Sequence, residues 1–153
     1  MPASPLLSLF TSFLATLGFG VLLRAPGRAL PWAALAGAAA HGAYRGLAAA
    51  GLPEEAAIFL AALLASFLSE LLARRMRMAA TVFVTPSIIP LVPGLALYRA
   101  MAFLAQGESK AGLELGVVAM ASFLMIALGV AMGSFLWRLL PGRPPASGGA
   151  GEG

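Results

Sequence analysis

The segment Thr85-Pro86-Ser87-Ile88-Ile89-Pro90-Leu91-Val92-Pro93-Gly94 places three prolines and a glycine in a stretch that is otherwise apolar enough to cross a bilayer. Each proline lacks a backbone N–H and collides with the carbonyl one turn earlier, so it interrupts the hydrogen bonds of a helix. Hydrocarbon holds no water to pair the freed groups, so such a segment needs surrounding protein or a wet cavity. The sequence predicts a discontinuous membrane helix that ends one half around Thr85 and begins the other beyond Gly94.

The composition of the chain is that of an integral membrane protein. Of its 153 residues, 60% are hydrophobic and 10% are charged, and the mean hydropathy is +0.91, whereas soluble domains carry roughly 25% charged residues. A spanning helix needs about 20 apolar residues. We expect one membrane-spanning domain over residues 1–140. Residues 141–153, rich in Pro, Gly, Ala and Ser, are expected to form a disordered cytoplasmic tail.

The residue types that are missing exclude several kinds of chemistry. The chain has no cysteine and no aspartate, and His41 is its one histidine. It cannot by itself assemble a Ser-His-Asp triad or a two-histidine metal site. We therefore expect no catalytic residue, no metal and no cofactor, and we do not expect an enzyme. The net charge of +4 comes from arginines dispersed between apolar stretches, which argues against nucleic acid as a partner.

Five stretches have the length and apolar character of membrane spans. They are residues 5–23, 30–50, 56–73, 79–104 and 113–140. The predicted fold is an all-α, polytopic membrane helix bundle of about five spans, with a discontinuous fourth span.

Positive charge predicts the orientation of these spans, because Lys and Arg collect in cytoplasmic loops. If every span crosses, one side receives Arg24, Arg28, Arg74, Arg75, Arg77, Arg138 and Arg143. The sequence therefore predicts a multi-pass protein of the cell (inner) membrane with its N-terminus outside and its C-terminus in the cytoplasm. A re-entrant proline segment would export the last two of these arginines, so five crossings are favoured over four.

Small residues four positions apart form two ridges that favour close helix packing. One ridge is Ala38, Gly42, Gly46 and Ala50, and a shorter one is Gly129 and Gly133. Packing within the chain and contact with another subunit both remain open for each ridge.

The broken span supplies the main candidates for a substrate path. A half-helix N-terminus offers N–H groups and partial positive charge to a carboxylate, and unwound carbonyls can hold an ammonium or a cation. The candidates are Thr85, Pro86, Ser87, Pro90, Pro93 and Gly94. The alternative is that the prolines only kink a packed helix.

Two pairs of polar residues in the spans are secondary candidates. Tyr98 and Arg99 follow one turn after the break, where Arg99 could pair with a substrate carboxylate or extend to the interface. His41 and Arg45 lie one turn apart on one helix face. His41 could bind an anionic group or relay a proton, or it could simply hydrogen-bond a neighbouring helix.

Glu70 is a further candidate for proton coupling, together with His41. It stands four residues before Arg74, which is the spacing of a helical ion pair. An ion pair and a proton-carrying role are therefore the two interpretations of this carboxylate.

Several of these motifs together resemble the threonine/serine exporter family, in its small-subunit or C-terminal-half form. The resemblance is carried by Gly18-Phe19-Gly20, Pro26, Arg28, Leu30, Gly37, His41-Gly42, and the segment from Pro86 to Gly94 with Tyr98 and Met101. It covers residues 18–101, and the membrane profile continues beyond it.

The resemblance implies a secondary transporter that exports small hydrophilic metabolites, either threonine/serine-type amino acids or, as in some relatives, small dicarboxylates such as succinate. It also implies a larger membrane subunit of the same family as a partner, besides the lipid bilayer and the substrate. The alternative is an assembly or scaffold subunit that supports a partner without lining the transport path.

Overall fold

The structure is a computed structural model, and it describes residues 5–139. In this part of the chain every regular element is a helix: α1 (Pro5–Leu22), α2 (Leu30–Ala49), α3 (Glu54–Met76), α4 (Thr81–Ile88), the short 3-10 helix η1 (Ile89–Leu91), α5 (Gly94–Ala105) and α6 (Ser109–Leu139). The predicted all-α membrane bundle is confirmed. The predicted fourth span corresponds to α4, η1 and α5, and each other predicted stretch corresponds to one helix.

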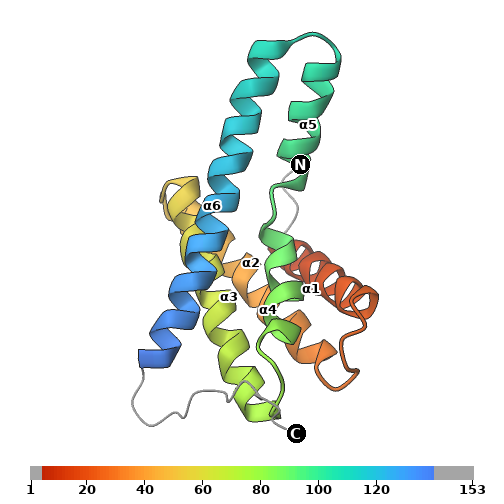
Figure 1. Cartoon of the computed structure of the whole chain (residues 1–153), viewed down its shortest axis with the longest axis vertical. Helices are drawn as coiled ribbons and strands as arrows, with labels where there is room; N and C mark the ends of the chain where they lie inside the picture. The colour runs from red at the N-terminus through yellow and green to blue at the C-terminus, as the bar shows by residue number, and fades with distance from the viewer. Residues whose placement is uncertain (1–4, 140–153) are drawn as a thin grey trace, which may run out of the picture.

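The helices form a bundle from which one hairpin projects. The most extensive contact joins α3 to α6, and α2 lies between α1 and α3. The α4 helix contacts α2 and α3, whereas α5 has α6 as its one substantial neighbour within the described chain. In Figure 1, α5 and the first half of α6 stand side by side above the other helices.

The α3 and α6 helices run in the same direction. Gly129 of α6 lies against Phe59 of α3, and Gly133, one turn later, lies against Leu63 and Ser66. Because both sequences advance together, the helices are parallel. A re-entrant loop between them would have made them antiparallel, so the segment from α4 to α5 traverses the bundle once, as Figure 1 also shows.

Length and composition make α3 and α6 candidate membrane spans, and the bent pair α4–α5 a third. With 31 residues, α6 is roughly 46 Å long and exceeds a hydrocarbon core of about 30 Å. The apolar part of α1 is shorter than these helices, and α2 is rich in alanine and glycine. For α1 and α2, crossing the membrane remains a prediction.

The ends of α1 and α3 share one backbone motif. Arg24 and Arg77 both have φ near 54°, the left-handed conformation in which many helices end. In each case the next N–H closes the turn, from Ala25 to the Gly20 carbonyl and from Met78 to the Ala73 carbonyl, both at 2.9 Å. An arginine thus marks two ends that the sequence predicts on the same side of the membrane.

The two predicted small-residue ridges differ in how they pack within the described chain. Gly129 and Gly133 are buried against α3. On α2, Gly42 lies against Leu9 of α1, whereas Gly46 faces open space and Ala50 is exposed. The buried face of α2 is instead formed by Ala33, Ala34, Ala36, Gly37 and Ala40, and the Thr16 side chain of α1 fits against Gly37.

Candidate substrate path at the broken helix

The break in the fourth span lies later than the sequence predicts. The α4 helix continues through Pro86 to Ile88, and only at Val92, with ψ of 126°, does the chain become extended. The expectation that the first half ends around Thr85 is therefore wrong. Pro86 is the sixth residue of α4, and the first four N–H groups of a helix have no partner within it. Its missing N–H therefore removes only one hydrogen bond from this short helix, which continues past the proline.

The interruption falls close to the middle of the broken span. Eight residues of α4 and three of η1 precede it, and the twelve residues of α5 follow it. The two halves are bent by 54°. Leu91, the last residue of η1, packs in one cluster with Ile58 and Ala61 of the first turns of α3. Unpaired backbone groups that are buried at this level of a membrane bundle need partners from protein or water.

Proline chemistry leaves the Pro90 carbonyl without its ordinary helical partners. Pro93, three residues later, has no N–H, and the N–H of Gly94 donates instead to the Val92 carbonyl at 2.8 Å. The imidazole of His41 lies beside the Pro90 carbonyl and interacts with it electrostatically. The break therefore presents an oxygen acceptor to a titratable side chain of α2.

His41 joins α1, α2 and the break. Its Nε2 and the Ser8 hydroxyl of α1 are hydrogen-bonded at 3.0 Å, so the predicted bond to a neighbouring helix is present. The second ring nitrogen, Nδ1, is buried without a hydrogen-bond partner. The Pro90 carbonyl is the acceptor that a hydrogen on Nδ1 would meet. In the tautomer with its hydrogen on Nε2, both Nδ1 and this carbonyl retain capacity for a ligand.

A pair of buried serines connects α4 to α3. Ser87 and Ser69 are fully buried, with their hydroxyl oxygens 3.4 Å apart. Each hydroxyl also donates to a carbonyl of its own helix, Ser87 to Val84 and Ser69 to Ala65. Pro86 is buried beside them, whereas Thr85 faces outward from the bundle. The structure thus separates two hydroxyls that the sequence places together.

The remaining predicted residues lie away from this junction. Arg45, Tyr98 and Arg99 are exposed, and Tyr98 retains 70% of its accessible surface. Glu70 is half-buried, and within residues 5–139 it forms no ion pair with Arg74. Of the titratable candidates, the structure therefore brings His41 alone to the break.

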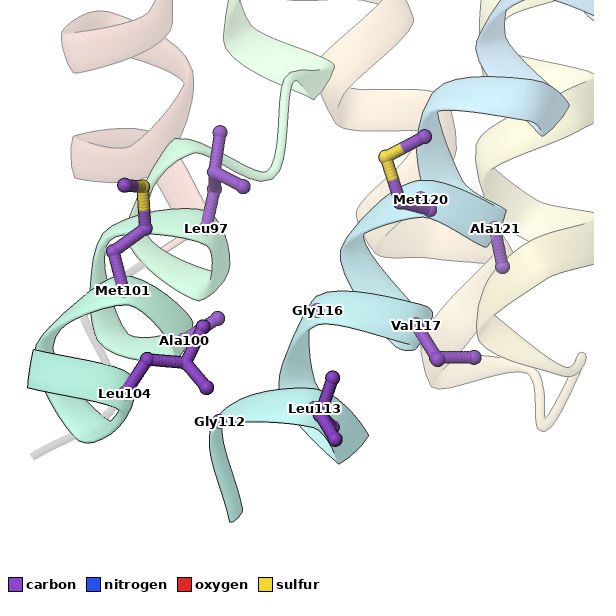
Figure 2. Close-up of a pocket in the computed structure, with 10 residues that line it drawn as sticks. All are labelled: Leu97, Ala100, Met101, Leu104, Gly112, Leu113, Gly116, Val117, Met120 and Ala121. Atoms are coloured by element: carbon purple, nitrogen blue, oxygen red, sulfur yellow. The ribbon is translucent and has the colours of Figure 1, made fainter. Parts of the chain in front are cut away.

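The best-defined cavity lies between α5 and α6 and is apolar. Figure 2 shows its lining, which comes from both helices: Leu97, Ala100, Met101, Leu104, Gly112, Leu113, Gly116, Val117, Met120 and Ala121. Its volume is about 500 Å³. Since no charged or hydroxyl-bearing side chain lines it, the groove suits hydrocarbon and is poorly matched to a hydrophilic metabolite.

Sequence reasoning missed Ser8 as a partner of His41. A signal was present, because Ser8, Ser12 and Thr16 recur every four residues and therefore share one helix face. All three are buried. The hydroxyls of Ser12 and Thr16 donate to carbonyls four residues earlier, which leaves Ser8 as the member whose hydroxyl is hydrogen-bonded to another helix.

Comparison with known families gives the assignment. The profile described as "Threonine/Serine exporter, ThrE" matches residues 8–136. The chain belongs to the threonine/serine exporter family. Every residue of the junction around His41 and of the broken helix falls inside the matched region.

Membership in this family identifies the protein as a membrane transport protein with a threonine/serine exporter function. The family is one of transporters, so transport rather than bond-making chemistry is the activity to explain at the break. No solved structure matches the chain significantly.

Proposed function

We propose that this exporter chain lines the substrate path itself, with the interrupted helix α4–η1–α5 as the central element. The supporting observation is the junction at the break, where the Pro90 carbonyl and His41 Nδ1 both lack ordinary partners. Unpaired polar groups inside a membrane bundle are costly unless a solute or water satisfies them. A passing metabolite is such a solute.

The two sides of the break suit the two ends of a zwitterion. The α5 helix begins at Gly94, so its first N–H groups and its dipole favour a carboxylate. On the other side, the Pro90 carbonyl favours a hydrogen-bond donor such as an ammonium. Small hydroxy amino acids fit this polarity directly. Small dicarboxylates such as succinate would use the α5 end alone.

Thr85, Pro86, Ser87, Pro93 and Gly94 are assigned to the path through this helix. His41 and Glu70 are the titratable groups proposed for proton coupling, and His41 is favoured by its place at the break. We propose that three exposed residues contact the substrate before or after it reaches the break. They are Arg45, Tyr98 and Arg99.

We propose further that the transporter includes a larger membrane subunit of the same family. An odd number of crossings puts the two ends of this chain on opposite sides of the membrane, and many transporters combine such a unit with one of inverted orientation. The exposed apolar face of α5, including Leu95 and Met101, must meet lipid or protein. Whether this face of α5 meets lipid or a partner subunit, the polar break still faces the inside of the bundle.

The proposed location is the cell (inner) membrane, with the N-terminus outside and the C-terminus in the cytoplasm. This orientation rests on the arginines at the ends of α1 and α3 and on the rule that such residues remain cytoplasmic. Residues 1–140 are proposed as one membrane domain. The predicted tail, residues 141–153, lies outside the described residues.

The test is flux of serine, threonine and succinate in proteoliposomes that contain this chain with and without the larger subunit. The P90A/P93A double variant should lose transport while it still co-purifies with the partner. The control is P53A, because Pro53 precedes α3 in an exposed turn and its replacement leaves the break unchanged.

A scaffold subunit remains the second candidate function, favoured by the open face of α2 around Gly46. In that case the P90A/P93A variant would transport normally, and bulky replacement of Gly46 would release the partner. Intact flux in the double variant would therefore indicate that the partner forms the substrate path and that this chain only supports it.

A further inference from the structure

Ser8, His41 and Pro90 bring three elements to one point, α1, α2 and η1. The Ser8 hydroxyl meets His41 Nε2 at 3.0 Å. The Ser8 carbonyl already accepts the hydroxyls of Thr11 and Ser12, each at 2.9 Å. The serine is buried, and its hydroxyl holds the Nε2 edge of the imidazole ring against α1.

This contact has a consequence for the proton on the neutral imidazole. When Nε2 carries the hydrogen, it donates to the Ser8 hydroxyl oxygen, and Nδ1 keeps a free lone pair. Nδ1 is buried and unbonded, and the Pro90 carbonyl stands beside the ring. Two acceptors then face the same small region, and neither can satisfy the other. A donor with several N–H groups satisfies both.

We propose that His41, in the tautomer with its hydrogen on Nε2, and the Pro90 carbonyl oxygen bind the α-ammonium group of an amino-acid substrate, and that Ser8 is a positioning residue whose hydroxyl oxygen accepts the Nε2 hydrogen. This subsite rests on the proposed function of the break as the substrate path. It names the substrate class as amino acids, because a dicarboxylate offers two acceptors where the subsite requires a donor.

The charges around the subsite indicate a zwitterion rather than a simple amine. On α2 the charged neighbour is Arg45, and on α3 it is Glu54, which accepts a hydrogen bond from Tyr44 at 3.3 Å. Tyr44 in turn lies 6.0 Å from the His41 ring, centroid to centroid. The described parts of α1 and η1 contribute no charged group. With no carboxylate in contact with the ring, the carboxylate of the substrate itself must balance the ammonium.

Protons compete with the substrate for the same nitrogen. A proton on Nδ1 removes the lone pair and adds a like charge, so protonated His41 repels the ammonium. The half-saturation concentration for serine is therefore expected to rise as the pH falls through the range in which histidine titrates. The charged His41 would instead donate from Nδ1 to the Pro90 carbonyl and occupy the subsite.

The test measures half-saturation concentrations for serine transport by the complete transporter, between about pH 8 and about pH 6. N-acetylserine, which keeps the carboxylate and hydroxyl but lacks the ammonium, serves as an inhibitor for comparison. The variants are H41L, which removes the acceptor, H41N, which keeps an acceptor near the Nδ1 position without titrating there, and S8A.

We expect H41L to raise the half-saturation concentration for serine by about 10- to 100-fold, as expected for a lost bond to a charged group. Inhibition by N-acetylserine should not change in H41L. H41N should transport serine with little dependence on pH. S8A should show a smaller rise and an altered pH profile, because the imidazole loses its hydrogen-bond partner on Nε2.

The proposal is overturned if H41L leaves serine half-saturation unchanged, or if it weakens N-acetylserine as much as serine. Co-elution of each variant with its partner in detergent shows that the complex is assembled. If P90A/P93A abolishes flux while H41L behaves as wild type, the ammonium subsite is wrong and the path through the break stands. If neither substitution affects flux, the proposed function fails as well.

Discussion

Gly129 of α6 lies so close to the Phe59 carbonyl of α3 that a Cβ on Gly129 would come within 2.5 Å of that oxygen. Ala62 and the Leu63 backbone complete the contact. In lipid, apolar side chains alone do not favour helix over hydrocarbon, so such close backbone approach is a main source of helix association. The parallel α3–α6 pair depends on it.

The G129A substitution should therefore loosen this pair. The added methyl group meets backbone atoms that cannot rotate away, so we expect destabilisation of about 1–3 kcal/mol. Thermal or denaturant unfolding of the purified protein in detergent measures the effect. G116A is the matched control, because Gly116 lies on the same helix and a Cβ there would meet open space, so this variant should unfold like the wild type. Equal loss in both variants would show that α6 is sensitive to alanine in general.

A double substitution can test the contact between α1 and α2. A Cβ on Gly37 would overlap the Thr16 side chain, which is fully buried. G37A should destabilise the protein by about 1–3 kcal/mol, and T16A should restore much of the loss because it removes the clashing atoms. Unfolding of both single variants and the double variant gives the coupling. Strict additivity would contradict the direct contact.

Ser66 provides a test of polar packing between α3 and α6. Its hydroxyl donates to the Val130 carbonyl at 2.9 Å and lies 3.1 Å from the Ser134 hydroxyl. S66A should cost about 1 kcal/mol in unfolding free energy, and S134A should cost less, since the bond to Val130 survives. A larger effect for S134A would mean that the hydroxyl–hydroxyl contact is the stronger one.

Restoring one N–H at the break should affect transport more than stability. P93A gives residue 93 a donor for the Pro90 carbonyl, so the helix can continue and the carbonyl is no longer free for a substrate. We expect flux to fall by roughly tenfold, the effect of about 1.4 kcal/mol, with unchanged expression. P86A serves for comparison, because α4 is already helical at that position. Equal flux in P93A and wild type would show that the opening at Val92 has no role.

Orientation can be measured directly, since the chain has no native cysteine. R75C is expected to react with a membrane-impermeant thiol reagent from the cytoplasmic side, and E108C from the outside. Both side chains are exposed and lie at the ends of different helices. The reverse pattern would invert the proposed orientation, and labelling of both from one side would remove the crossing by α4 and α5.

The sequence predicts the helices of this protein well because the signal is compositional. Long apolar runs are separated by boundaries of Gly, Pro and charged residues, such as the boundary that begins at Gly51. Each run ends where a bilayer or a turn requires it. The break was also predictable, because three prolines without backbone N–H groups cannot all fit within one continuous helix. Its exact point was not, because whether Pro86 ends a helix depends on where that helix begins.

The junction around His41 shows what the sequence does not reveal. That His41 meets Ser8, 33 residues earlier, depends on the crossing of α1 and α2, which spacing along one helix does not specify. The same reason explains the ridge on α2: every fourth residue is small along several faces of an alanine-rich helix. Which face is buried depends on neighbouring helices such as α1, whose Thr16 fits against Gly37.

The hairpin of α5 and α6 has one more consequence. The α6 helix is unbroken from Ser109 to Leu139, and its glycines pack it closely against α3. It therefore holds one side of the hairpin in place. Any rotation of α5 about Val92 and Pro93 would have to preserve its close packing on α6, where Gly112 lies against Leu104 and the Ala100 carbonyl. The first half of α6 therefore limits the angles that the break can adopt.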